Sequence, residues 1–290
     1  MLFRSMTARI DSIGAQLISL KSKSGTEYIW QRDPAHWKSS SPLLFPTVGN
    51  CRDGKYTLNG QIYSIPKHGF CRNADFAVSV LSEQEASFIL TDSPETRAHY
   101  PFAFHLKLTY ALTEDGIRIH YTVTNPGTGP MYYQLGAHPG FNCPLHSGER
   151  FEDYVLEFEQ EGTAGYHSYD LNRMEFNMNS YTPILDHAAV IPLTHELFAN
   201  DAIFFTDLRS KKVALKNQAT GYGVEVSYPD FATVAFWTAA ATKAPFLCVE
   251  PWNGSAIRSD EDDNFLNRHF LKKVESGESK EYQIWIKKIS

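Results

Sequence analysis

The sequence contains few cysteines and has no long apolar segment near its start. Its 290 residues include four cysteines, none of them in a C-x-x-C pair. The chain therefore lacks the cysteine density of a disulfide scaffold, and free thiols in a reducing compartment are the simplest interpretation. The N-terminal stretch MLFRSMTARIDSIGAQL is too charged for a secretory signal or a transmembrane span. We expect a cytoplasmic protein without a membrane partner.

Charge of one sign is not concentrated in any part of the chain. Lysine and arginine number 27 against 33 acidic residues, which gives a formal net charge of -6. The lack of a long basic tract argues against nucleic acid and against an anionic membrane surface as partners. The motifs G-x-S-x-G and G-x-G-x-x-G and the P-loop are absent as well. Their absence weakens a serine-hydrolase or nucleotide-binding function.

Strong helical periodicity is scarce, whereas short alternating runs recur between turn residues. The clearest run is 104–124, in which apolar and polar residues alternate on both sides of Glu114-Asp115-Gly116. This pattern predicts a β-hairpin with a D-G turn. Short helical turns are expected over 194–200 and 260–268. The polar residues 147–180 are expected to form a long irregular excursion over the sheet.

Many short strands with few helices predict an all-β fold, a large antiparallel sandwich or barrel. No linker-like stretch or fixed-period repeat divides the chain, so we expect one domain over residues 1–290. Large β-sandwiches hold ligands on a concave face. Site residues are therefore expected at strand ends and in the loops that return across that face.

Two histidines lie in loops whose backbone is constrained by proline and glycine. His68 lies between Pro66 and Gly69, and His138 lies in the stretch GAHPGFN. Rigid supports of this kind reduce the orientation error of a side chain that must point at a fixed spot. The alternative is a pair of loop histidines whose ring nitrogens are satisfied by backbone groups.

An acidic residue follows an apolar run in FLCVEPWNGSAI, residues 246–257. The run predicts a buried strand with Glu250 at its end. Partial desolvation there raises the pKa of a carboxyl group and makes the carboxylate a better base at neutral pH. The alternative is a solvated or salt-bridged glutamate at a strand end.

Two aromatic residues follow these polar residues closely: Phe141 lies three positions after His138, and Trp252 lies two after Glu250. Sugar rings have apolar C–H faces that rest on aromatic rings, while their hydroxyls favour Asp, Asn, Arg and His. The two pairs therefore indicate a carbohydrate site. The alternative is that both aromatic residues belong to the core, as aromatic residues usually do.

A metal site is the main competitor of a sugar site. His138, Cys143 and His146 are close in sequence, but they lack a familiar zinc spacing. We therefore expect no metal ligands in this chain.

These stretches resemble the aldose 1-epimerase (galactose mutarotase) family, and most closely its LacX-like branch. The resemblance covers most of the chain. Its motifs, in order, are GAQLISL (14–20), YIWQ (28–31), LLFPTVG (43–49), KHGFCR (67–72), GAHPGFN (136–142), LFANDAIFF (197–205), CVEPWNG (248–254) and VESGESKEYQIWI (274–286). Each motif alone is weak, whereas the ordered set is fairly specific.

The resemblance implies a galactose mutarotase-like β-supersandwich and a cofactor-free isomerase that interconverts the α and β anomers of an aldose. Carried over by motif, His138 is the general acid at the ring oxygen and Glu250 is the general base at the C1 hydroxyl. His68 contacts the sugar near the ring oxygen. Asp201 binds sugar hydroxyls, with Asp207 as the fallback. The implied partner is a small-molecule aldose sugar.

One position departs from the family pattern. The arginine that commonly follows the F-P-x-x-G glycine is replaced by Asn50, and the nearest arginine is Arg52. Arg52 and Arg72 are therefore the two candidates for the missing sugar contact. Arg72 follows H-G-F-C and loosely resembles a phosphate-facing arginine of hexose-6-phosphate mutarotases.

Three other functions stay open on these residues. A hexose-6-phosphate mutarotase needs a basic cluster for the phosphate, which Arg52, Lys55, Lys67 and Arg72 could supply, although solvated surface charge is the favoured interpretation of these four residues. A non-catalytic carbohydrate-binding protein of the same fold needs no acid–base pair. A glycoside hydrolase needs two carboxylates at one bond, and only Glu250 is well placed. A monomer or a weak homodimer is expected.

Overall fold

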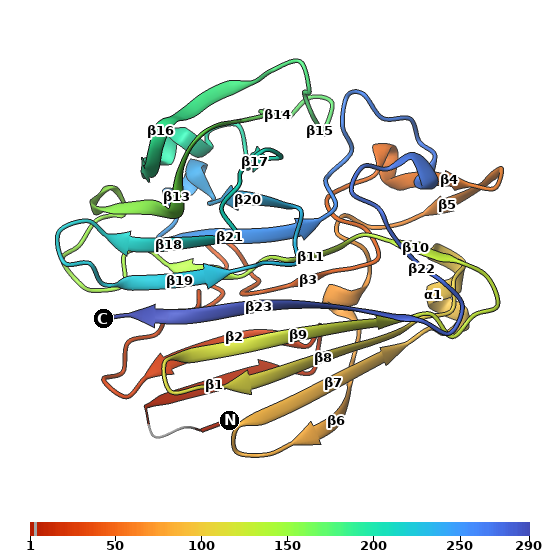
Figure 1. Ribbon diagram of the computed structural model, residues 1–290, viewed down its shortest axis with the longest axis horizontal. Coiled ribbons are helices and arrows are strands. Elements are labelled where there is room, and N and C mark those ends of the chain that lie inside the picture. The colour runs from red at the N-terminus through yellow and green to blue at the C-terminus, as the bar shows by residue number, and fades with distance from the viewer. Residues whose placement is uncertain (3–4) are drawn as a thin grey trace.

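Antiparallel strands dominate the computed structural model, which describes residues 1–2 and 5–290. They form a nine-stranded sheet, a six-stranded sheet and four two-stranded units (Figure 1). Helical segments are few and short. The prediction of an all-β fold of antiparallel strands with a few short helices is confirmed.

The nine-stranded sheet forms one face of the molecule. Figure 1 shows β23, β9, β8 and β7 side by side across its lower half. From one edge to the other the strands are β16 (Thr182–Pro192), β13 (Tyr154–Tyr166), β18 (Lys212–Asn217), β19 (Gly223–Ser227), β23 (Ser279–Ile289), β9 (Gly116–Thr124), β8 (His105–Leu112), β7 (Glu85–Thr91) and β6 (Ala77–Leu81).

The six-stranded sheet contains β21 (Phe246–Asn253), the strand that carries Glu250. Its central strand pairs with neighbours at both edges, and every residue of that strand is buried. In spatial order the strands are β17 (Ile203–Phe205), β20 (Thr233–Trp237), β21, β11 (Leu135–Ala137) and β3 (Leu43–Leu44), with β12 (Gly140–Asn142) also paired to β21.

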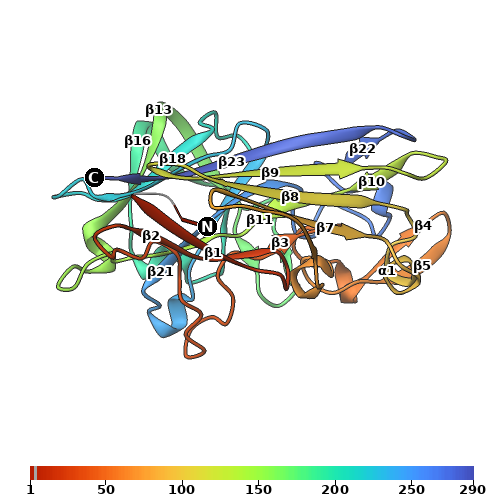
Figure 2. The same cartoon turned by 90° about the horizontal axis from the view of Figure 1, so that it is seen from below.

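The remaining elements are small. The two-stranded units are β1 (Met6–Asp11) with β2 (Gln16–Ser22), β4 (Lys55–Leu58) with β5 (Gln61–Ser64), β10 (Met131–Tyr133) with β22 (Lys272–Val274), and β14 (Tyr169–Asp170) with β15 (Glu175–Phe176). The helical segments are α1 (Pro94–His99) and the 3-10 turns η1 (Arg52–Gly54), η2 (Cys71–Asn73), η3 (Phe151–Asp153), η4 (His195–Phe198), η5 (Ala240–Thr242) and η6 (Phe265–Asn267). In both views α1, β4 and β5 lie together at the end of the molecule away from the C-terminus (Figures 1 and 2). Within residues 1–2 and 5–290, no helix has the length and apolar character needed to cross a membrane.

The hairpin predicted over 104–124 is confirmed as β8 and β9. The two strands pair in register from His105 with Thr124 to Leu112 with Ile117. Every second residue of β8 is buried, as the alternating pattern requires. The expected helical turns over 194–200 and 260–268 contain η4 and η6.

The prediction of an irregular excursion over 147–180 is wrong for much of that segment. Residues 154–166 form β13, which pairs with both β16 and β18 inside the nine-stranded sheet. Alternating burial is confined to its first half, where Leu156 and Phe158 point inward. Polar residues and register shifts follow, at Gly162 among others. The second half therefore carries no period-two signal in the sequence.

The two faces of β21 have different surroundings. Leu247 and Val249 pack into the main core between the two large sheets. Because strand side chains alternate, Cys248, Glu250 and Trp252 point to the opposite face. That face is covered by loops and by the β14–β15 hairpin rather than by a sheet, and the candidate site lies there.

Candidate active site

Glu250 lies in the interior of β21, opposite Ala235 on β20. Its side chain is only 2% exposed. The strand continues through Pro251, which lies opposite Val234, to Asn253. The prediction that Glu250 ends the strand is therefore wrong, because the extended backbone accommodates the fixed φ of Pro251. A buried carboxyl group at this place has no bulk water around it.

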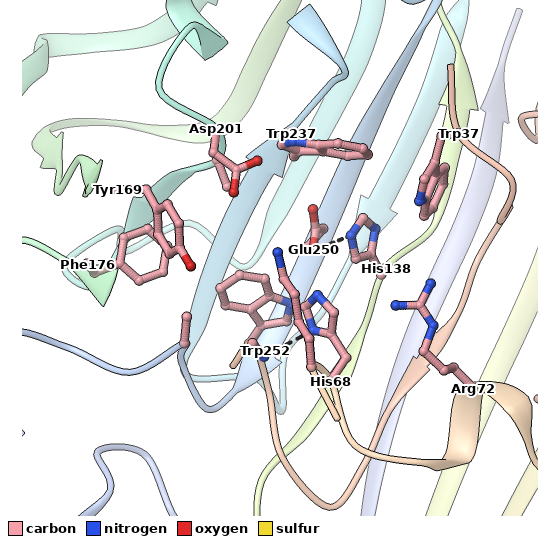
Figure 3. A pocket seen from close by; sticks show the side chains of 14 residues that line it. Trp37, His68, Arg72, His138, Tyr169, Phe176, Asp201, Trp237, Glu250 and Trp252 are labelled. Atoms are coloured by element: carbon pink, nitrogen blue, oxygen red, sulfur yellow. Dashed lines mark hydrogen bonds and ion pairs between the residues drawn. The ribbon is translucent and has the colours of Figure 1, made fainter. Parts of the chain in front are cut away.

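His138 approaches Glu250 from the neighbouring strand. It follows β11 directly, in the turn toward β12, and the Val249 amide donates to the Pro139 carbonyl at 3.1 Å, which ties this turn to β21. His138 Nε2 lies 3.2 Å from Glu250 Oε2 (Figure 3). The histidine is also buried. This separation allows a proton to be shared between the two side chains.

Aromatic rings, rather than hydrogen bonds, enclose the imidazole of His138. Trp37 stacks on it with ring centroids 4.9 Å apart, and Trp237 meets it edge-on at 5.7 Å. His138 Nδ1 is buried and finds no hydrogen-bond partner within residues 1–2 and 5–290. Catalytic and metal-binding histidines usually have their second nitrogen fixed by a hydrogen bond. Here the orientation depends on stacking.

His68 is held by two backbone contacts in a left-handed conformation, with φ of 69°. Its amide donates to the Gly49 carbonyl at 2.6 Å, and the Gly49 amide donates to His68 Nδ1 at 3.0 Å. Because Nδ1 accepts a hydrogen bond, the neutral ring carries its proton on Nε2. Its ring lies edge-on to that of His138, with centroids 5.7 Å apart. His68 is thus a preset hydrogen-bond donor beside the pair.

Two cations line the same space. Arg72, in η2, donates from Nη2 to the Ser39 hydroxyl at 3.1 Å, and Lys67 precedes His68. Neither cation forms an ion pair with any carboxylate in the described part of the chain. Burial lowers the pKa of Arg72, while the nearby Glu250 raises it. Arg72 is partly buried and Lys67 is exposed, so both donors remain available to an oxygen-rich ligand in the cavity.

The opposite wall is formed by Asp201 and the β14–β15 hairpin. Tyr169 and Phe176, one from each strand of the hairpin, face the cavity together with Asp201 (Figure 3). The Tyr169 hydroxyl donates to Asn50 Oδ1 at 2.9 Å, and Asn50 Nδ2 donates to the Met174 carbonyl at 2.6 Å. Asn50, which replaces the usual arginine of the family, thus holds this hairpin in place.

These walls enclose a cavity of about 250 Å³. This volume lies just below the roughly 300–1,000 Å³ that small-molecule sites occupy. The lining mixes aromatic faces with charged groups. It comprises Trp37, Gly49, Lys67, His68, Arg72, His138, Tyr169, Phe176, Asp201, Ala202, Trp237, Glu250, Trp252 and Ala256.

Burial shifts the pKa values of the central groups toward their uncharged forms. It raises the pKa of Glu250 well above its usual range, and the negative charge of Asp201 adds to this increase. Burial lowers the pKa of His138, as do the charges of Arg72 and Lys67. Desolvation disfavours whichever form carries charge, so an acid and a base shift in opposite directions.

Six of the residues predicted from the sequence share this cavity. They come from four separate stretches of the chain, which the fold brings together (Figure 3). The six are His68, Arg72, His138, Asp201, Glu250 and Trp252. Asp207, the fallback for Asp201, lies elsewhere on the exposed surface and accepts a hydrogen bond from the Tyr181 hydroxyl at 2.6 Å.

The structure does not bring Arg52 into the cavity, and this corrects the expected sugar contact. Its guanidinium donates to Asp263 at 2.7 Å and to Glu175 at 3.1 Å. These two carboxylates occupy its donors outside the cavity. Phe141 is also corrected: it pairs opposite Leu247 in the sheet and is fully buried in the main core. It is a core residue, because its position on β12 faces the main core.

Four aromatic residues of the site were missed by sequence reasoning. Trp37 lies in the irregular segment between β2 and β3, and Trp237 ends β20. Tyr169 and Phe176 belong to the segment expected to be irregular. No period or motif distinguishes these residues from ordinary core aromatics, so only the tertiary fold reveals them.

One group of side chains beside the cavity could hold a metal ion. His138, Cys248 and Glu250 each offer a ligand atom, and these atoms all lie within 4.8 Å of one another. All three residues are buried. Cys143 and His146, considered with His138 from the sequence, are not members of this group.

Comparison with known proteins identifies the family. The aldose 1-epimerase family model matches residues 3–262. The chain belongs to the aldose 1-epimerase family. The chromosomal LacX protein of Lactococcus lactis subsp. lactis is 33% identical over 275 residues, which are 93% of this chain and 92% of that protein. The resemblance read from the motifs is confirmed, and so is its isomerase class.

Solved structures of similar fold support this membership. The galactose mutarotase related enzyme from Lactobacillus acidophilus superposes with a TM-score of 0.94 at 29% identity, covering 100% of this chain and 96% of that one. A galactose mutarotase-like protein from Lactobacillus casei gives 0.91 at 28% identity, covering 100% and 99%. The predicted galactose mutarotase-like fold is thereby confirmed.

Proposed function

We propose that this member of the family is a mutarotase that interconverts the α and β anomers of an aldose, with Glu250 and His138 as its acid–base pair. The observation that supports this most strongly is the 3.2 Å contact between His138 Nε2 and Glu250 Oε2. Both groups line a cavity of about 250 Å³ whose other walls are aromatic and charged. Such a cavity suits a single sugar ring.

The reaction needs two proton transfers at oxygens that share one carbon. Glu250 takes the proton of the C1 hydroxyl, and His138 gives a proton to the ring oxygen as the C1–O5 bond breaks. The product is the open-chain aldehyde. After rotation about C1–C2, O5 attacks the other face of C1, His138 recovers its proton, and Glu250 returns a proton to the new C1 hydroxyl. Two groups in contact with each other fit two oxygens on the same carbon.

The remaining polar groups fit substrate positioning. The Nε2 proton of His68 is available to the ring-oxygen side of the sugar. Asp201 lies on the opposite wall and is suited to accept from sugar hydroxyls. Trp252 offers an aromatic face, and its indole N–H is buried with no protein partner in the described residues. A sugar hydroxyl could accept that hydrogen bond.

The pair is expected to work with one proton between its two members. Burial raises the pKa of Glu250 and lowers that of His138, so at rest the shared proton lies on Glu250 and both side chains are neutral. The reactive form has this proton on His138 and leaves Glu250 ionised. A proton on Glu250 and a proton on His138 are two forms of the same net charge. Adding a second proton or removing the first abolishes one of the two roles, so activity follows a bell-shaped pH profile that belongs to the pair.

The exchange rate between anomers tests the assignment. Saturation-transfer NMR on the two anomeric protons of glucose and galactose gives this rate directly. Glu250→Gln and His138→Asn should each lose on the order of 10²–10⁴ of the enzymatic rate, because a positioned acid or base contributes about that factor. Glu281→Gln and His120→Asn, at exposed positions on β23 and β9, are the matched controls. Full activity in either site variant contradicts the assignment, and saturable sugar binding by the unaltered protein without rate enhancement contradicts the proposed function.

A phosphorylated substrate is the second candidate, and the unpaired cations favour it. Arg72 and Lys67 both line the cavity without a carboxylate partner among the described residues. Two cations at one site suit a phosphate dianion, which accepts charge-assisted hydrogen bonds strongly. Of the four basic residues considered from the sequence, Arg52 is already paired elsewhere.

Comparison of glucose with glucose 6-phosphate separates the two candidates. A phosphosugar enzyme has a much higher kcat/KM for glucose 6-phosphate, and Arg72→Gln or Lys67→Gln removes that preference. Lys55→Gln, on β4 outside the cavity lining, is the control. Equal or higher kcat/KM for glucose rejects the phosphosugar candidate and leaves the mutarotase itself in place.

A further inference from the structure

The thiol of Cys248 lies close to the Glu250–His138 pair. This cysteine lies two residues before Glu250 on β21, and strand alternation puts both side chains on the same face. His138 reaches that face from the β11–β12 turn. Ligand atoms of the three residues lie within 4.8 Å of one another. Cys248 does not line the cavity, whereas His138 and Glu250 do.

The donor set is the one that zinc prefers. Thiolate, imidazole and carboxylate ligands are typical of Zn²⁺ and of its spectroscopic substitute Co²⁺, whereas Mg²⁺ and Ca²⁺ require oxygen ligands. The 3.2 Å between His138 Nε2 and Glu250 Oε2 also fits. With metal bonds of about 2.0–2.1 Å to each atom, that separation gives an angle of roughly 100° at the metal, close to tetrahedral.

We propose that His138, Cys248 and Glu250 form an inhibitory site for a thiophilic divalent cation, with the fourth coordination position facing the cavity. On binding, the Cys248 thiol proton and the single proton shared by Glu250 and His138 both leave to solvent, Cys248 forms the sulfur–metal bond, and His138 Nε2 and a Glu250 oxygen donate lone pairs. No oxidation or reduction takes place. Three protein ligands with one open position match the known catalytic type of zinc site.

Inhibition follows from which atoms the cation occupies, and this part rests on the proposed mutarotase function. The lone pair of His138 Nε2 and the Glu250 carboxylate are the groups assigned to proton transfer. Once coordinated, neither of them exchanges protons with a sugar. The cation is therefore a regulator or a poison of the reaction rather than its cofactor.

Cobalt absorption tests the site without any sugar. Co²⁺ added to the full-length protein should give the thiolate-to-cobalt charge-transfer band and the visible bands of a four-coordinate ion. Cys248→Ala should lose the charge-transfer band. Cys143→Ala, which removes another buried free thiol that is not part of the group, should retain it. Absence of the band in the unaltered protein, or its persistence in Cys248→Ala, overturns the proposal.

Anomeric exchange tests the inhibition. Zn²⁺ should slow the exchange catalysed by the unaltered protein, EDTA should restore it, and Mg²⁺ should have no effect. Inhibition of Cys248→Ala should require at least about tenfold more Zn²⁺ than inhibition of the unaltered protein. Losing one of three metal ligands weakens metal binding at least as much as losing a contact that supports a ligand. Equal Zn²⁺ sensitivity of the two proteins contradicts the site. If the cobalt band appears but no mutarotation is detected, the metal site stands and the proposed function fails.

Discussion

Trp37 stacks on the imidazole of His138, with ring centroids 4.9 Å apart and planes inclined by 26°. The tryptophan is itself fixed: its carbonyl accepts from the indole N–H of Trp30 at 2.8 Å. Its loop is anchored at a second point, where His36 Nδ1 lies 2.7 Å from the Thr242 hydroxyl. Since His138 Nδ1 has no partner among the described residues, we infer that Trp37 orients His138, the proposed general acid.

Replacing Trp37 should therefore impair catalysis more than binding. We expect Trp37→Ala to lower kcat roughly 10–100-fold, because small displacements of a catalytic group are costly. The added solvation of His138 should raise its pKa and move the corresponding limb of the pH–rate profile to higher pH. Trp37→Phe, which keeps a stacking ring, should recover most of the rate. Lys38→Ala, exposed in the same loop, is the control.

An increase confined to KM in Trp37→Ala, with an unmoved pH profile, contradicts this orienting role. It indicates instead that Trp37 serves as a platform for the sugar.

Asp201 is expected to affect both sugar affinity and the pH profile. Its negative charge raises the pKa of Glu250, so Asp201→Asn should lower that pKa. Activity falls at low pH because Glu250 takes up a proton. In Asp201→Asn this fall should therefore occur at a lower pH. KM should rise as well, because a hydroxyl-binding carboxylate is gone. Asp207→Asn, exposed and outside the cavity lining, should change neither quantity. Movement of the limb to higher pH contradicts the predicted sign.

Glu250 should reduce the stability of the fold as the pH rises. Its pKa is raised in the folded state above the unfolded value of about 4.3. Its stabilising contribution is therefore complete below about pH 4.3 and is lost as the pH rises through the folded value. Because glutamine does not titrate, the Tm of Glu250→Gln should exceed that of the unaltered protein by a margin that grows with pH. Each tenfold difference in proton affinity between the folded and unfolded states corresponds to about 1.4 kcal/mol of unfolding free energy.

Thermal melts of both proteins between pH 5 and pH 9 measure this margin. Glu281→Gln, exposed on β23, should show no such growth with pH. A margin for Glu250→Gln that shrinks as the pH rises contradicts the raised pKa.

Gly49 supports the site by close approach. A Cβ at this position would lie 2.3 Å from the Ala256 backbone, and its φ is +66°. Gly49→Ala should therefore destabilise the fold, displace His68, and raise KM. Gly60→Ala is the matched control, since Gly60 has a similar φ of +79° but open space around it. Both variants bear the cost of positive φ, of order 1 kcal/mol, so the difference in Tm between them measures the clash alone. Equal Tm values for the two variants contradict the steric account.

Local signals in the sequence were sufficient for much of the fold and of the site. The β8–β9 hairpin follows from its alternation and its D-G turn. His138 and Glu250 stand out because an unusual local context surrounds each one. The position of Glu250 inside the strand was not predicted, because proline usually marks a strand end, whereas here the strand continues through Pro251.

What the sequence missed depends on contacts between distant segments. Arg52 looked like a sugar ligand until its partners, Glu175 and Asp263, were found more than a hundred residues away. Trp37 lies in a segment without periodicity, so nothing in its neighbourhood indicates that it stacks on His138. Phe141 differs from Trp252 only in which face of the sheet it occupies, and alternation alone does not say which face holds the ligand.

A double-mutant cycle on the anomeric exchange rate tests the acid–base pair most directly. If Glu250 and His138 act as one unit, Glu250→Gln combined with His138→Asn should be about as slow as the slower single variant, because losing either group already disables the unit. Melts and sugar binding must show that all three variants remain folded. A double variant whose loss equals the product of the two single losses contradicts the pair, as does any single variant that exchanges anomers at the unaltered rate.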